Sequence, residues 1–335
     1  MKISTLLEDL RQKEHIPGVS IAIVQDQEVA LAEGYGWANL EHNVPATADT
    51  VYEIASITKL FTATAVMQLA EDGRIELSDP IGRHLPHLPT AWRPITIRQL
   101  LSHQSGIRSY TAVDQYWQTT RLDISRDELL SYVADLPLDF PPGQKYSYDN
   151  TGYYVLGFLI EAVSGQSYEA FLSERIFRPL GMASTRVNDP YAIVKNRAAG
   201  YSYDQVNDTI KHKPYYSPTG TFSAGVLLST VTDLAKFAQS LYSDLLLTAA
   251  SRAQMWTANL SEQENERRFD FSVGLGWFLV DHPRGRFAGH NGGIQGFASS
   301  FVHLLDSKTT FIVLCNQDTV AEPHQIGFEL LKLGI

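Results

Sequence analysis

The chain has 335 residues, of which 44% are hydrophobic and 19% are charged, a composition typical of a globular protein with enough length for a sizeable core. The 27 basic and 37 acidic residues give a formal net charge of -10, which argues against nucleic acid or an anionic membrane surface as the main partner. A single cysteine, Cys315, excludes a disulfide framework within the chain, and the apolar run 310–315 around it predicts a buried strand.

The N-terminal segment, residues 1–13, predicts an amphipathic helix with acidic residues in it. It lacks the apolar core of a secretory signal, and no stretch of the sequence is long and apolar enough to span a bilayer. We therefore expect a cytoplasmic protein if this is the whole translated chain, and a periplasmic or secreted one if it is a trimmed mature form.

The next segments predict a β-hairpin followed by a buried helix. Residues 19–24 and 29–32 flank a polar turn and form the hairpin, after which we expect residues 34–40 to leave the sheet. Residues 60–70 are almost wholly apolar, which indicates a helix buried on all sides, and Asp72-Gly73 ends it.

From Ser78 onward the sequence is rich in prolines and capped helices. Capping boxes begin helices at 96–99 and 125–128, and further helices are predicted at 150–163, from 167 to before Pro179, and from 230. Strands are expected again near the end, and a final helix follows them. The predicted strands are 271–280, 286–289, 296–304 and 309–316, and the predicted helix is 321–333.

This order predicts an α/β fold in which an antiparallel sheet is built from N- and C-terminal segments and flanked by helices, with an inserted, mostly helical region. We expect residues 1–75 and 225–335 to form the sheet domain and residues 76–224 to form the inserted helical domain. The active site is expected between them. The sequence contains no internal repeat.

Ser56 and Lys59 are the first candidate catalytic residues. Ser56 lies where the apolar helix should begin, and a capping serine is usually followed three residues later by Glu or Gln. Here Lys59 takes that place, a cation facing the positive end of the helix dipole. Residues three apart share a helix face, roughly 5–6 Å apart at Cβ, so a lysine made neutral by dipole and burial could accept the Ser56 proton. A capping serine beside a surface lysine is the structural alternative.

Tyr148 and Asn150 form the second candidate element, on a tight loop before a helix. A tyrosine becomes a usable base only beside a cation, which Lys59 could be, and the Asn150 amide can both donate to and accept from a substrate amide or ester. Alternatively, Tyr148 is a core aromatic residue and Asn150 is a helix N-cap.

The third element is the segment 289–293, in which His290 stands between a predicted strand and glycines. Gly292 and Gly293 would allow a backbone N–H to approach a bound carbonyl oxygen. The alternative is a turn with an exposed histidine. The segment does not match G-x-G-x-x-G, so a dinucleotide site is disfavoured.

In this order and spacing, the three elements resemble the serine β-lactamase and penicillin-binding-protein superfamily, on its class C β-lactamase and DD-peptidase side. The likeness covers nearly the whole chain and includes four further segments. These are Tyr52-Glu53-Ile54-Ala55, Leu100-Leu101-Ser102-His103-Gln104-Ser105-Gly106, Pro142-Gly143, and Ser223-Ala224-Gly225 ahead of Ser229-Thr230.

The resemblance implies an acyl-enzyme on Ser56, with Lys59 and Tyr148 as the proton-transfer pair and Asn150 at the acyl side of the substrate. His290-Asn291-Gly292 stands where the family carries Lys-Thr-Gly or His-Thr-Gly, and the backbone N–H groups of Ser56 and Gly293 would form the oxyanion hole. The resemblance accordingly implies that His290 is catalytic and that Asn291, Gly292 and Gly293 bind the substrate.

Two residues depart from the family pattern. Asp149 is an acid where a small residue is usual, and it either alters the local field or faces solvent. His290 replaces the lysine of β-lactamases, which removes a permanent charge that would help to bind a β-lactam carboxylate. We therefore expect an esterase or DD-peptidase acting on small esters, amides or D-amino-acid peptides, with β-lactamase activity as an alternative.

Other functions are disfavoured or left open. A metal site could be built from His84, His87 and His103, but the ligand spacing is poor, and we expect no metal and no cofactor. The absence of G-x-S-x-G from the sequence argues against an α/β-hydrolase. A sensor that is acylated without turnover stays open, as does the oligomeric state.

Overall fold

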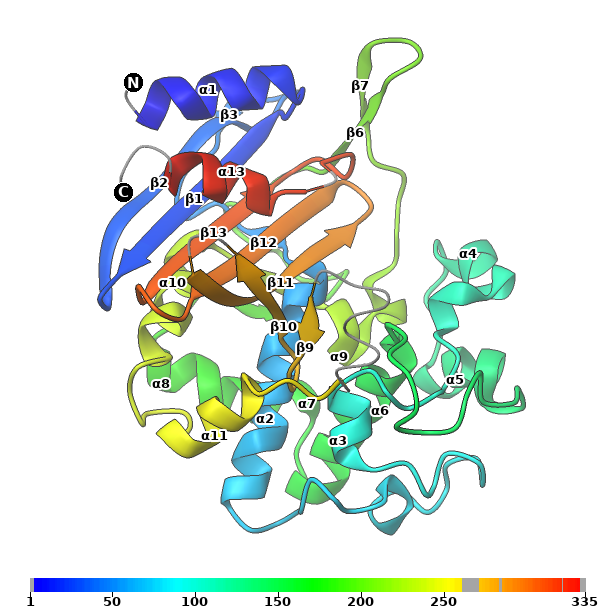
Figure 1. Cartoon of the computed structure of the whole chain (residues 1–335). Coiled ribbons are helices and arrows are strands. Elements are labelled where there is room, and N and C mark those ends of the chain that lie inside the picture. The colour runs from blue at the N-terminus through cyan, green and yellow to red at the C-terminus, as the bar shows by residue number, and fades with distance from the viewer. Residues whose placement is uncertain (1–2, 261–270, 283–284, 321, 332–335) are drawn as a thin grey trace.

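An eight-stranded antiparallel sheet joins the two ends of the chain in the computed structural model, which describes residues 3–260, 271–282, 285–320 and 322–331 (Figure 1). The strand order is β3-β2-β1-β13-β12-β11-β10-β9. The strands are β1 (Gly18–Gln25), β2 (Glu28–Asn39), β3 (Val44–Pro45), β9 (Ser272–Val273), β10 (Phe278–His282), β11 (Gly285–Ile294), β12 (Phe297–Leu304) and β13 (Thr309–Cys315).

Helices cover both faces of this sheet. The terminal helices α1 (Ile3–Lys13) and α13 (His324–Leu331) contact each other and one face, while α10 (Val231–Ser240) packs on the other face against β1 and β13 (Figure 1). In β13, Phe311 and Val313 belong to the core beneath α1 and α13, and Ile312 and Leu314 belong to the core on the opposite side. A strand buried on both faces is apolar without alternation, which explains the continuous apolar run around Cys315.

The middle of the chain is mostly helix and loop. Two small sheets accompany it, one of β4 (Tyr52–Glu53), β8 (Leu227–Ser229) and β5 (Arg186–Val187), the other of β6 (Tyr201–Asp204) and β7 (Thr209–His212). The α-helices are α2 (Thr58–Glu71), α3 (Ile97–Leu101), α4 (Asp114–Thr119), α5 (Arg126–Ala134), α6 (Asn150–Ser164), α7 (Tyr168–Leu172), α8 (Arg178–Leu180), α9 (Phe222–Gly225) and α11 (Ala249–Met255). The short 3-10 helices are η1 (Ala55–Ile57), η2 (Ile81–Arg83), η3 (Tyr110–Ala112) and η5 (Pro218–Gly220), and η4 (Ser173–Phe177) is a π-helix between α7 and α8.

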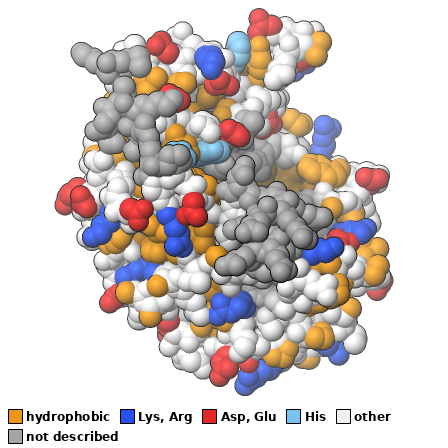
Figure 2. All heavy atoms as spheres, in the orientation of Figure 1, with side chains coloured by type: hydrophobic (Ala, Val, Ile, Leu, Met, Phe, Trp, Pro, Cys, Tyr) orange, Lys and Arg blue, Asp and Glu red, His pale blue; other side chains and the backbone are white. Residues whose placement is uncertain are grey.

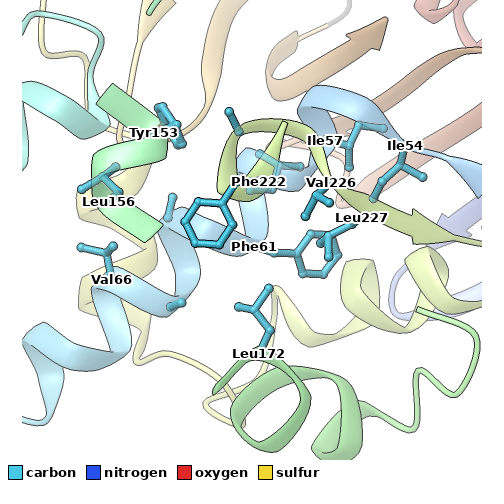
Figure 3. Packing of buried hydrophobic residues seen from close by; sticks show 14 of the residues in the cluster. Ile54, Ile57, Phe61, Val66, Tyr153, Leu156, Leu172, Phe222, Val226 and Leu227 are labelled. Carbon is cyan, nitrogen blue, oxygen red and sulfur yellow. The ribbon is translucent and has the colours of Figure 1, made fainter. Parts of the chain in front are cut away.

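Helix α2 lies in the centre of the larger core, and every residue from Thr58 to Leu69 is buried. It contacts α6 and α9, and Figure 3 shows Phe61, Tyr153 and Phe222 from these three helices among the packed side chains. The prediction of a helix buried on all sides is therefore confirmed. Because α2 is packed on all sides, it holds Ser56 and Lys59 at its N-terminal end in defined positions.

The α/β fold with an antiparallel sheet from both chain ends is confirmed, but the boundaries predicted for two segments were wrong. Residues 34–39 stay in the sheet as the second half of β2, which pairs with β1 as far as Gly36 and then with β3. The expected strand 271–280 is interrupted by a loop between β9 and β10. The last helix is described only as His324–Leu331, and its predicted ends at 321 and 332–333 lie outside the described residues.

On the face drawn in Figure 2, acidic and basic side chains are interspersed. Among the described residues, no helix combines the length and the apolar character needed to cross a membrane.

Candidate active site

Ser56 lies at a sharp bend between β4 and α2. The preceding residue, Ala55, has φ of +45°, a conformation that costs energy in a residue with a Cβ and that is found at functional sites more often than elsewhere. Helix α2 begins at Thr58, and its N-cap residue Ile57 makes no side-chain capping bond. Ser56 is therefore not the capping serine of the structural alternative, and its hydroxyl lies among reactive partners.

Lys59 is fully buried, so the alternative of a surface lysine is wrong. Its Nζ lies 3.1 Å from Ser56 Oγ, and it donates to the Asn150 side-chain oxygen at 2.8 Å and to the Ala224 carbonyl at 2.7 Å. Burial lowers the pKa of the Lys59 ammonium to about 7, and the charge of Asp149 opposes that change. Half of the Lys59 side chains are thus neutral near pH 7.

Tyr148 donates its hydroxyl hydrogen to Ser56 Oγ at 2.8 Å. The ring is held between aromatic neighbours, 4.6 Å from His103 and 6.2 Å from Phe278 between centroids. Burial raises the pKa of the Tyr148 phenol far above its usual value, so the residue is a neutral hydrogen-bond donor. Its hydroxyl points at the candidate nucleophile, and the interpretation as an ordinary core aromatic residue is wrong.

Asn150 is the first residue of α6, whose N-cap is Asp149, so its side chain is free of a capping role. Its oxygen accepts from Lys59 and its Nδ2 donates to the Thr111 hydroxyl at 3.2 Å. Asn150 therefore links Lys59 to Thr111 by hydrogen bonds.

Asp149 is buried and does not face solvent. It accepts from the Ser105 hydroxyl at 2.8 Å, and its backbone N–H donates to His103 Nδ1 at 3.1 Å. Burial raises the pKa of the Asp149 carboxyl to about 6, with Ser105 and Lys59 acting in the opposite direction. This carboxylate supplies negative charge behind Lys59.

His103 is a positioning residue that the motif analysis did not assign. Its ring lies tilted against that of Tyr148 and 4.9 Å from that of Tyr153. Its Nδ1 accepts from the Asp149 backbone N–H, so the ring proton is on Nε2. Burial lowers the pKa of His103 well below its usual value, which keeps it neutral. The sequence signal that could have indicated this role was the polar run Ser102-His103-Gln104-Ser105 directly after an apolar helix.

His290 lies within β11, which continues to Ile294, so the exposed turn of the alternative interpretation is wrong. Only 4% of its surface is exposed, and its ring lies 6.0 Å from that of Tyr148. Burial, with Lys59 nearby, lowers the pKa of His290 to about 3. Because the ring is neutral and Nδ1 donates to the Asn291 carbonyl at 2.5 Å, Nε2 carries a lone pair.

The two glycines bring β11 against η1. A Cβ on Gly292 would lie 2.3 Å from Ser299 Oγ and 2.4 Å from the Ile54 carbonyl, so only glycine fits this approach. A Cβ on Gly293 would meet no atom within 4 Å, and Gly293 lines the cavity at Ser56. Residues 290–294 of β11 extend past the last β10 pair, Phe278 with Gly289, and so present one strand edge to the site.

Asn291 is not brought together with Ser56. Its neighbours on β11 place it on the opposite face of the strand, where its Nδ2 lies 2.9 Å from His324 Nδ1 of α13. The substrate-binding role expected for Asn291 therefore stays a prediction, and the side chain lines the cavity beside His290 and His324 and not the one at Ser56. Side chains alternate along a strand, so a middle residue faces the other way.

The histidines considered for a metal do not meet. His84 pairs with Asp79 at 2.9 Å and His103 is packed against tyrosines. Within the residues that the structure describes, no cluster of three or more His, Cys, Asp or Glu side chains could hold a metal ion.

A cavity of about 190 Å³ opens at Ser56 and Gly293. Its walls are mainly aromatic and neutral: Tyr110, Thr111, Tyr116, Trp117, Asn150 and Tyr216. We call it the acyl-side cavity.

Comparison with known proteins matches residues 3–334 to the beta-lactamase family model. The chain is 29% identical to penicillin-binding protein 4* of Bacillus subtilis over 96% of its own length and 73% of that protein. It is 33% identical to protein flp of Staphylococcus aureus over 97% of its own length, but it spans only 64% of the length of that protein.

Two solved structures are similar over 99% of this chain. One is an octameric penicillin-binding protein homologue from Pyrococcus abyssi, with a TM-score of 0.87, 28% identity and 77% of that chain covered. The other is a D-stereospecific amidohydrolase from Streptomyces sp., with a TM-score of 0.84, 26% identity and 98% of that chain covered. With a family model matched from end to end and the same fold in both structures, this chain belongs to the beta-lactamase family.

Proposed function

We propose that this protein is a serine hydrolase that forms an acyl-enzyme on Ser56 and then hydrolyses it. The observation that carries the proposal is the convergence of Tyr148 Oη and Lys59 Nζ on Ser56 Oγ, at 2.8 Å and 3.1 Å. These groups come from α2 and from the loop before α6, and the strand edge of β11 lies beside them. We propose that the site works at the boundary between the sheet domain, 1–75 and 225–335, and the inserted domain, 76–224.

Lys59 is the proposed base for Ser56. A neutral amine has two hydrogens and one lone pair, and Lys59 has two carbonyl-type acceptors at 2.8 Å and 2.7 Å. If both hydrogens go to Asn150 and Ala224, the lone pair is left for the Ser56 hydroxyl. The three contacts thus suit the neutral lysine that burial favours, and they orient it toward the nucleophile.

Tyr148 is the proposed proton donor to the leaving group. Ser56 Oγ attacks the substrate carbonyl carbon while its proton passes to Lys59. As the bond from that carbon to the leaving nitrogen or oxygen breaks, the Tyr148 phenol gives its proton to the leaving atom and is reprotonated from Lys59. Both groups touch the same serine oxygen, so the net transfer is one proton from Ser56 to the leaving group. Water then attacks the ester and the steps run in reverse, which releases the acid.

The developing oxyanion is proposed to lie between the backbone N–H groups of Ser56 and Gly293. Gly293 has open space where a side chain would be, and the tight contact at Gly292 holds β11 close to η1. Two donors fixed in a rigid backbone stabilise a tetrahedral oxyanion without reorganisation.

We propose small amides, esters or peptides of D-amino acids as substrates. The Streptomyces relative is named a D-stereospecific amidohydrolase, and the aromatic acyl-side cavity suits an apolar side chain. Efficient β-lactamase activity is a weaker candidate because the neutral His290 offers no cation for the β-lactam carboxylate.

The test is intact-mass analysis of the protein with a p-nitrophenyl ester, a D-Ala-D-Ala peptide and a cephalosporin. We expect a Ser56 adduct that forms and turns over with the ester. An adduct that never turns over would instead identify a sensor. Ser56→Ala should abolish labelling by a fluorophosphonate, and a label that persists on the folded variant would contradict the proposal.

A further inference from the structure

A buried ion pair lies three residues before Ser56, and the proposed proton transfers do not use it. Glu53 of β4 is 6% exposed, and its carboxylate accepts from Lys213 Nζ at 2.6 Å and from Arg197 Nη2 at 3.2 Å. The Lys213 side chain is the more buried of the two cations. A buried carboxylate that loses its cation is left uncompensated, which is costly, so Lys213 is held against β4.

The same lysine holds the turn between β11 and β12. A Cβ on Gly296 would lie 2.4 Å from Lys213 Cδ, so the stem of the lysine packs directly on the backbone of this turn. Its Nζ lies 4.5 Å from the centroid of the Phe297 ring, which is a cation–π contact. The Gly296 N–H also donates to the Asp318 carboxylate at 2.8 Å. Lys213 therefore joins β4 to the tip of the β11–β12 hairpin.

Lys213 belongs to the base of the β6–β7 hairpin. It directly follows β7, and its N–H donates to the carbonyl of Gly200, the residue before β6, at 3.0 Å. At the start of β6, the Tyr201 N–H donates to the Gly296 carbonyl at 3.4 Å. The hairpin projects from the body of the molecule in Figure 1, whereas its base contacts the β11–β12 turn.

All three segments that meet at Lys213 continue into the proposed site. β4 leads to Ser56, and three residues beyond the lysine Tyr216 lines the acyl-side cavity. In the β11–β12 hairpin Gly293 pairs with Ala298, so a shift of the turn also shifts the Gly293 N–H. Because an oxyanion donor acts only at hydrogen-bond distance, a displacement of about 1 Å can cost about 10²-fold in rate.

We propose that Glu53 and Lys213 are positioning residues for the oxyanion hole, and that their ion pair sets the separation between the backbone N–H groups of Ser56 and Gly293. The inference rests on the proposed acyl-enzyme function and adds to it the part that the base of the β6–β7 hairpin takes. The pair acts through the position of the backbone and not through proton transfer.

The test measures single-turnover acylation by a p-nitrophenyl ester and the affinity for phenylboronic acid, which forms a tetrahedral adduct on a nucleophilic serine. Lys213→Met should lower both by about 10- to 100-fold, because both need two aligned donors. The pH of half-maximal acylation should stay near 7, because the pKa of Lys59 depends on its own burial and on Asp149. A pair with a purely structural role would lower the melting temperature and leave the rate and the boronate affinity of the folded variant unchanged.

Three further variants serve as rescue, control and coupling test. Lys213→Arg keeps a cation for Glu53 and should restore most of the lost rate. Lys211→Met breaks the exposed ion pair with Asp204 in the same hairpin and should change neither the rate nor the boronate affinity. Glu53→Gln combined with Lys213→Met should lose no more than the more damaging of the two single variants, because the two changes break one pair.

The outcomes separate the two proposals. A folded Lys213→Met variant with the wild-type rate and boronate affinity would overturn the positioning role and leave the acyl-enzyme function standing, as would losses that multiply in the double variant. If melting curves show that Lys213→Met is not folded, Glu53→Gln carries the test, and unchanged values in that variant would overturn the role. Wild-type protein with no ester hydrolysis and no fluorophosphonate label on Ser56 would refute both proposals.

Discussion

Lys59 should make acylation depend on pH around neutrality. Burial lowers the pKa of its ammonium from 10.5 to about 7. At pH 7 such a lysine is about half neutral, whereas one with a pKa of 10.5 is neutral in only about 3 molecules in 10,000. The buried position therefore increases the population of usable base by on the order of 10³-fold at pH 7.

The assay is single-turnover acylation by a p-nitrophenyl ester between pH 5 and 9, with Lys59→Met and Lys59→Arg as the perturbations. In the wild type we expect a rise of about ninefold from pH 5 to pH 6, a half-maximal rate near pH 7 and a plateau above about pH 8, following the neutral fraction of Lys59. Methionine has no basic nitrogen and arginine does not deprotonate in proteins, so both variants should lose roughly 10²–10⁴ of the rate and the inflection near pH 7.

The same group links stability to pH. The folded-state pKa of Lys59 is below the unfolded value, so between about pH 7 and 10.5 the unfolded chain binds more protons and the contribution of Lys59 to the free energy of unfolding rises with pH. The contribution is least favourable below pH 7. Lys59→Met should therefore gain most stability relative to wild type at low pH, as measured by urea unfolding at pH 6 and pH 9. A wild-type acylation rate that keeps climbing above pH 9, or that is flat from pH 5 to 8, would refute the reasoning.

Three further predictions follow from the same contacts. Tyr148→Phe should slow amide hydrolysis by about 10²–10⁴ but slow a p-nitrophenyl ester much less, because p-nitrophenolate leaves without protonation; equal losses in the two kcat/KM values would return the role of base to Tyr148. Asp149→Asn removes a negative charge that raises the pKa of Lys59, so the acidic limb of the pH–rate profile should move to lower pH. An acidic limb at unchanged or higher pH would contradict the placement of this carboxylate behind the lysine. Gly292→Ala should destabilise the fold by about 1–3 kcal/mol, because the new methyl group would overlap Ser299 and the Ile54 carbonyl. Gly293→Ala should leave the melting temperature unchanged and reduce activity, because its methyl group would meet no neighbouring atom. If both variants lowered the melting temperature equally, the close contact between β11 and η1 at Gly292 would be contradicted.

Local patterns in the sequence were sufficient for much of the fold. Thr96 and Gln99 form the capping box that their spacing predicts, and the Thr230 side chain caps α10 through the Asp233 N–H. Gly165 ends α6 in a left-handed conformation. Such signals depend on residues within one or two turns of each other, so they can be recognised without knowing the tertiary structure.

The convergence of the site was expected from the resemblance, whereas its chemistry depended on contacts between distant segments. β1 pairs with β13, almost 300 residues away, and that pairing completes the sheet whose edge reaches Ser56. The end of β2 at Asn39 was not predicted because pairing with β3, and not the residue types of the segment itself, keeps it in the sheet.

The sequence by itself determined which residue types were available: a serine and a lysine one turn apart, a tyrosine before a helix, and a histidine ahead of two glycines. Only the tertiary structure decided the protonation states and the orientations of these side chains. It buried Asp149, made His290 neutral and turned Asn291 toward α13. The physical reason is that a pKa depends on the water displaced by side chains from distant parts of the chain, and that the register of a strand decides which of its residues faces the site.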